Sequence, residues 1–212
     1  FRLYVTLLLL GSLVLTLELW TEGIAKGEEA IRASVFQFVS MMTTTGAASA
    51  DFNLWTTFAA VTLVAAMFFG GSAGSTAGSV KVVRHLLLGR ILRRELDQTV
   101  HPEIVSRVRL NGTPVDERIL RAILSFVLLY IGVFALGTFF LVGDAARVDL
   151  DLRVLDAVAA SATTLGNVGP AFGVAGPMGS FEPYSGLSKS LMIVLMWVGR
   201  LEIIPVAVLL TR

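Results

Sequence analysis

The sequence predicts an all-α membrane protein made of two parallel repeats, each a membrane span, a re-entrant helix and a second span. Three observations lead to this prediction: the composition, four long apolar segments, and two similar helices that end in polar turns between those segments. Of the 212 residues, 55% are hydrophobic and 16% are charged, and the mean hydropathy is +0.77. A soluble domain of this length cannot bury so much apolar surface.

Four segments have the length and composition of a membrane span. A helix that crosses the hydrocarbon needs about 20 predominantly apolar residues. The alternative, buried core helices of a soluble protein, is disfavoured by the composition. The four segments are Leu3 to Trp20, Leu54 to Gly70, Ile119 to Val142 and Leu187 to Leu210.

The loops between the spans differ in charge, which predicts their side of the membrane. Residues 81–118 carry eight Lys or Arg against five Asp or Glu, whereas 18–53 and 144–186 each carry two against five. Basic loops stay on the cytoplasmic side, so we expect 81–118 and both chain ends inside. In that linker, the Asn-Gly of "VRLNGTPV" favours a small hairpin, and His101-Pro102 is expected to end the preceding helix.

The two outer segments resemble each other. "GEEAIRASVFQFVSMMTTTGAAS" follows the first span, and "DLDLRVLDAVAASATTLGNVGPAFG" follows the third. Each begins with acidic residues, which suit a helix N-terminus, continues as an apolar helix and breaks at Thr and Gly. An ordinary extracellular connection would not need such apolar helices. A re-entrant helix explains them, provided that the chain returns along a water-filled cavity or inside protein.

The repeats give a domain organisation. Residues 1–84 are predicted to form one pore repeat and 118–212 a second, with 85–117 as the cytoplasmic linker. In the first repeat, the carbonyl groups of residues 43–46 can replace the hydration shell of a cation, as in potassium-channel filters. Gly46 supplies backbone angles that other residues adopt only with strain. The polar turn therefore predicts the lining of a potassium-channel-like pore.

Five segments together resemble the Trk/Ktr/HKT potassium-transporter superfamily, specifically its Trk-type membrane subunit. They are "TTTGAASADFNLW", "FFGGSAGSTAGSVKVVR", "HPEIVSRVRLNGTPV", "ATTLGNVGPAFG" and "VGRLEIIPVAVLLTR". The resemblance implies four such units around one pore, of which this chain matches the third and fourth. We therefore expect the chain to be a fragment.

The resemblance also implies filter residues in both repeats. Two alignments of the repeats are open: a shift of 123 positions pairs Gly46 with Gly169, and a shift of 120 pairs it with Gly166. We prefer 123, because Pro170 then follows the filter glycine as in the family. The implied filter residues, with K⁺ as the bound ion, are Thr44, Thr45 and Gly46, and Asn167, Val168 and Gly169.

A glycine-rich run, "GGSAGSTAGS" from Gly70 to Ser79, interrupts the second span. It lacks the spacing of a phosphate-binding loop. One alternative is close helix packing through Gly70, Gly74 and Gly78. The resemblance instead implies a mobile gate below the filter. The implied gate residues are Gly70, Gly71, Ser72, Gly74, Ser75, Gly78 and Arg200.

Two charges, Arg200 and Glu202, fall inside the last predicted span. A charge at that depth costs at least ~2.5 kcal/mol, which marks it as a functional candidate. A structural pairing of Arg200 with Glu202 or with carbonyl groups is the alternative. The resemblance implies that Arg200 faces the pore beside the gate. Lys81 and Arg84 are expected to be anchors at the cytoplasmic mouth.

These features predict potassium uptake across the cell inner (plasma) membrane through a gated filter, with sodium left open as a second ion. A secondary transporter with a midplane site and a non-conducting scaffold are the alternatives. An enzyme is not expected, since the sequence shows no metal-ligand cluster and neither His85 nor His101 has an evident nucleophile or carboxylate partner. We expect no covalently bound cofactor, K⁺ as the transported ligand, and no nucleic acid. The implied partners are membrane lipid, a cytoplasmic nucleotide-binding regulatory subunit and a second copy of the full-length chain.

Overall fold

The computed structural model describes residues 2–72, 75, 77–101, 103, 107–110 and 112–201. The described residues are mainly helical, which confirms the predicted all-α class. The helices are α1 (Arg2–Thr21), α2 (Gly27–Met42), α3 (Thr57–Phe68), α4 (Val82–Val100), α5 (Glu117–Arg147), α6 (Val154–Gly166) and α7 (Gly186–Arg200). The strands are β1 (Phe69–Gly70), parallel to β2 (Val80–Lys81), and β3 (Arg109–Leu110), antiparallel to β4 (Thr113–Pro114).

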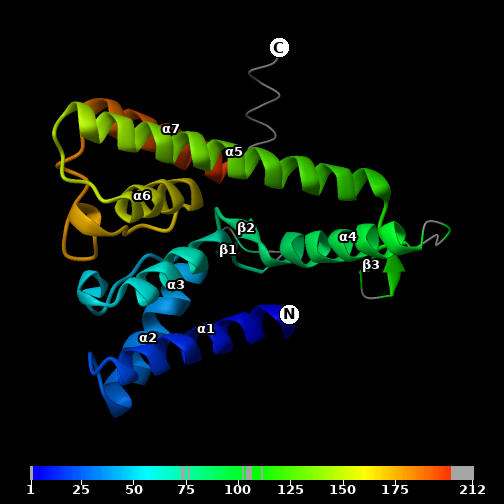
Figure 1. Cartoon of the computed structure of the whole chain (residues 1–212), viewed down its shortest axis with the longest axis horizontal. Coiled ribbons are helices and arrows are strands. Elements are labelled where there is room, and N and C mark those ends of the chain that lie inside the picture. Colours follow the sequence, from blue (N-terminus) through cyan, green and yellow to red (C-terminus); the bar gives the residue numbers. More distant parts are fainter. Residues whose placement is uncertain are drawn as a thin grey trace.

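Six of the seven described helices form two groups of three. Helices α1, α2 and α3 pack against one another, as do α5, α6 and α7, and the two groups meet where α3 contacts α6. Figure 1 shows that α1 and α5 run toward the same end of the molecule, while α3 and α7 run back from it. The two groups therefore have the same helix order and direction.

Of the described helices, α1 and α5 are long and apolar enough to cross a membrane. Much of their surface is apolar and exposed: Phe139 is 80% exposed, Leu136 71% and Leu9 67%. Soluble proteins rarely leave large continuous apolar faces in water. These faces suit contact with lipid or with further membrane helices.

The second spans differ from the predicted ones. Helix α3 has 12 residues, so the predicted helix from Leu54 to Gly70 was too long. It begins at Thr57 because the Thr56 hydroxyl accepts a hydrogen bond from the Ala59 N–H, which caps the helix. It ends at Phe68 because the next residue leaves the helix to pair with Val80. The continuation of α7 predicted for residues 202–210 lies outside the described residues.

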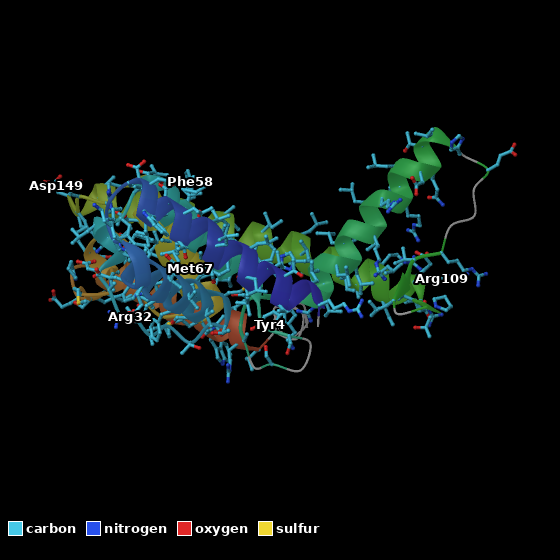
Figure 2. The ribbon with its side chains drawn as sticks, turned by 90° about the horizontal axis from the view of Figure 1, so that it is seen from below. Tyr4, Arg32, Phe58, Met67, Arg109 and Asp149 are labelled. Carbon is cyan, nitrogen blue, oxygen red and sulfur yellow. The ribbon has the colours of Figure 1, made fainter. Side chains whose placement is uncertain are left out.

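The linker extends from the helical groups at one end of the molecule. Helix α4 ends at Val100 with His101 as its cap, as predicted. Its buried Leu87 and Ile91 pack on α5. In Figure 2, Arg109 of β3 and Asp149 of the loop after α5 lie at opposite ends of the long axis. The basic linker and the acidic loop are thus well separated, as the charge-based topology requires.

Candidate functional site: two facing turns and an interrupted helix

The first candidate turn, residues 43–46, folds back onto the end of α2. The backbone N–H groups of Thr45 and Gly46 both donate to the carbonyl of Ser40, at 2.9 and 3.4 Å, and the Thr44 N–H donates to Met41 at 3.2 Å. These bonds satisfy carbonyl groups that the helix end leaves without partners. Thr44 and Gly46 have φ values of +54° and +73°, while Thr45 between them does not lie in the left-handed region.

The second candidate turn, residues 166–169, repeats this geometry at the end of α6. The Val168 N–H donates to the Thr163 carbonyl at 2.9 Å, and the Asn167 N–H donates to Thr164 at 3.3 Å. Asn167 and Gly169 have positive φ values of +52° and +133°. The positive φ values fall at equivalent positions in the two turns at a shift of 123, and the hydrogen bonds of Asn167 and Val168 match those of Thr44 and Thr45. At a shift of 120, Gly46 would correspond to Gly166, which is still helical.

The hydrogen bonds fix the direction of the carbonyl groups. In a planar trans peptide, each N–H points away from the carbonyl of the preceding residue. Because the N–H groups of the two turns point back to their helices, the carbonyls of residues 43–45 and 166–168 point away from the helix ends. Each helix C-terminus also carries partial negative charge, which favours a cation nearby. The turns therefore present carbonyl oxygen atoms beyond the helix ends, in a field that suits a cation.

The two turns touch each other. A Cβ atom on Gly46 would lie 2.0 Å from the Val168 carbonyl oxygen, and one on Gly169 would lie 3.2 Å from the Gly46 Cα. Glycine is needed at position 46 for two reasons, since both its positive φ and this contact exclude a side chain. Beyond the turns, we call residues 47–53 and 170–176 the return segments.

An irregular segment, residues 69–81, separates α3 from α4, and we call it the interrupting loop. Phe69 and Gly70 pair with Val80 and Lys81, so its ends lie side by side. The described residues between these strands are not helical, which disfavours the alternative of a continuous packing stripe. A Cβ on Gly78 would lie 2.7 Å from the carbonyl oxygen of Gly166. The loop thus contacts the second turn.

Arg200 lies beside the interrupting loop. It lines, together with Gly78, Ser79 and Arg84, a cavity of about 180 Å³. The guanidinium group of Arg84 lies 4.0 Å from the centroid of the Phe126 ring, a distance typical of a cation–π contact. Among the other implied gate residues, Gly70, Gly71, Ser72 and Ser75 lie in the described part of the loop. Gly74 and Glu202 are outside the described residues.

A histidine packs against the start of the loop. The His85 ring lies 4.7 Å from that of Phe69. Burial lowers the pKa of His85 below its usual value, and a hydrogen bond to the Lys81 carbonyl offsets part of this effect. His85 is therefore expected to be neutral where it supports the loop.

Comparison with known proteins identifies the chain. A family model described as TrkH, "Cation transport protein", matches residues 3–211. The chain belongs to the TrkH family. It is 35% identical to the Trk system potassium uptake protein TrkH of Salmonella typhimurium, over 100% of this chain and 42% of that protein. It is 36% identical to the Trk system potassium uptake protein TrkI of Halomonas elongata, over 97% of the chain and 41% of that protein.

A solved structure agrees with this assignment. The crystal structure of the potassium transporter TrkH from Vibrio parahaemolyticus matches with a TM-score of 0.86 and 33% identity, over 99% of this chain and 43% of that one. The predicted family resemblance and the multi-pass membrane location are therefore confirmed. The chain spans less than half the length of the TrkH family members that it matches, which fits the expected fragment.

Sequence reasoning missed two hydroxyl groups that tie the turns of this TrkH-family chain to their helices. The Ser40 hydroxyl donates to the Ala47 carbonyl at 2.6 Å, and the Thr163 hydroxyl accepts from the Gly169 N–H at 2.9 Å. Ser40 and Thr163 are also related by the shift of 123. Comparing the two repeats position by position would have found them.

Proposed function

We propose that this chain forms two walls of a gated pore through which a TrkH-family transporter takes up potassium, with sodium left open as a second ion. The observation that supports this proposal most directly is the pair of touching turns, which have positive φ values and hydrogen bonds to the preceding helix at equivalent positions. Residues 44–46 and 167–169 are the proposed ion-binding residues, and K⁺ is the proposed transported ligand. The names of the relatives, Trk system potassium uptake proteins, agree with this ion.

Backbone oxygen atoms would provide the selectivity. Carbonyl groups that replace the hydration shell of a cation distinguish ions by their number, field strength and spacing. The side chains of the two turns differ, with threonines in the first and Asn-Val in the second. The backbone geometry is what the turns share, so we assign ion recognition to the carbonyl groups of both turns rather than to hydroxyl groups.

The interrupting loop is the proposed gate. It contacts the second turn through Gly78 and shares a cavity with Arg200. A positive charge beside the pore opposes cation passage while the loop is in place. Opening would require the loop to move, which a segment rich in glycine and serine allows at little steric cost.

We also propose partners for the full-length protein. Residues 1–84 and 118–212 would be two of its pore repeats, and the linker 85–117 would dock a cytoplasmic nucleotide-binding regulatory subunit. A second copy of the full-length chain and membrane lipid are the other proposed partners. Removing residues 85–117 should abolish co-purification of the regulatory subunit, and equal recovery would refute this docking site.

Ion flux tests the function. The full-length protein that contains this chain is reconstituted in liposomes with a K⁺ or Na⁺ gradient, and both fluxes are measured. We expect K⁺ flux that exceeds Na⁺ flux and requires the protein. Liposomes that conduct neither ion, with or without the regulatory subunit, would contradict the proposal.

A further inference from the structure

One side chain, Asn53, joins the two return segments. Its Nδ2 donates to the Gly173 carbonyl at 3.0 Å, and its Oδ1 accepts from the Gly173 N–H, also at 3.0 Å. The residues lie 120 positions apart in sequence, so this pair is a contact between the two repeats. Asn53 follows Gly46 by seven residues, and Gly173 follows Gly169 by four.

The surroundings hold this amide in place. The Asn53 N–H donates to Asp51 at 3.1 Å, which fixes the backbone beside the side chain. On the other side lies Gly176, where a Cβ atom would be 2.0 Å from the Asn53 Nδ2. Gly176 has an ordinary φ of −67°, so its backbone does not require glycine. The reason for glycine at this position is therefore space for the amide.

We propose that Asn53 is a positioning residue of the filter, which fixes the return segment of one repeat against that of the other and thereby sets ion selectivity. This inference rests on the proposed function. The two turns already touch through backbone atoms, so a small relative shift of the return segments changes the spacing between their carbonyl groups. Side chains that determine such spacing affect selectivity even though they do not touch the ion.

The fold does not depend on this amide alone. The buried rings of Phe52 and Phe172 lie 5.0 Å apart and join the same two segments through apolar contact. Removing the amide should therefore leave the segments together but less exactly aligned. The expected result is altered selectivity in a folded protein.

Three variants of the full-length protein test this proposal by the ratio of K⁺ to Na⁺ flux in liposomes. Asn53→Ala should lower the ratio about fivefold, the change that corresponds to one net neutral hydrogen bond. Gly176→Ala should have a similar effect, because its methyl group displaces the amide. The double variant should be no worse than Asn53→Ala alone, because truncation of Asn53 removes the three heavy atoms nearest to that methyl group.

A matched control separates this effect from general loss of a polar group. The Thr62 hydroxyl donates to the Phe58 carbonyl one turn earlier in its own helix, at 2.9 Å, so Thr62→Ala should keep the wild-type ratio. An unchanged ratio in both single variants, or a double variant whose loss equals the product of the two, would overturn the role of Asn53. If the wild-type protein shows no preference for K⁺ over Na⁺, that result contradicts the proposed function and not the role of Asn53.

Discussion

Replacing Gly46 with alanine tests the contact between the two turns. The substitution has two effects that can be estimated separately. Alanine at a φ of +73° is strained by roughly 1–2 kcal/mol. Its Cβ would also lie 2.0 Å from the Val168 oxygen, so the two must separate by about 1.4 Å to reach the 3.4 Å of ordinary contact.

A carbonyl shift of this size should change the binding of the ion more than it changes folding. We expect Gly46→Ala to lower the K⁺/Na⁺ flux ratio of the full-length protein at least about tenfold, equivalent to about 1.4 kcal/mol. The assay is flux in liposomes under paired K⁺ and Na⁺ gradients. Thermal unfolding in detergent measures the loss of stability in parallel.

Two other glycines serve as controls. Gly23 has a φ of +69° but nothing within 4 Å of an added Cβ, so Gly23→Ala reports strain without contact. Gly132 has neither feature and lies inside α5, so Gly132→Ala should leave the flux ratio unchanged and raise the stability by about 0.5–1 kcal/mol, because alanine favours a helix interior. If Gly46→Ala leaves the flux ratio unchanged, or if Gly23→Ala lowers it equally, the turn contact does not set selectivity.

Three further changes probe other parts of the site. Arg200→Ala should raise flux measured without the regulatory subunit, because it removes a positive charge beside the pore; unaltered basal flux would count against the gate. Thr44→Asn should raise the stability of the fold by about 1 kcal/mol in thermal unfolding, since asparagine tolerates the left-handed region better than a β-branched residue. Stability should fall as the pH drops below about 6.5, because the lowered pKa of His85 means that the unfolded chain binds the proton more tightly. His85→Leu should reduce this pH dependence, and an identical pH profile would argue against the buried imidazole as its source.

Much of the fold could be predicted because its determinants are local. Long apolar runs indicated α1 and α5, and the proline after His101 indicated the end of α4. The end of α3 could not be predicted in this way. Phe68 and Phe69 are equally compatible with a helix, and the helix stops because Phe69 pairs with Val80, a residue beyond the glycine-rich run.

The candidate site was only partly predictable for a related reason. The glycines at positions 46 and 169 indicated where the two turns lie, but the segments "TTTG" and "GNVG" have only their final glycine in common. The match of the two turns lies in backbone hydrogen bonds to the helix ends, which the side chains do not encode. The positive φ of Thr44 could not be predicted from residue preferences, since β-branched residues rarely adopt it. Such strain is typical of functional positions. Asn53 acts through a partner 120 residues away, so no local pattern could have marked it.

The unlike side chains of the two turns have a consequence for genetics and engineering. In a channel assembled from identical subunits, one codon change alters every wall of the pore at once, so its effects multiply. Here Thr44 and Asn167 occupy equivalent places and can be exchanged one at a time. In the proposed pore, each substitution would enter a single wall, so ion preference could be tuned in small increments, and the two walls could diverge independently of each other.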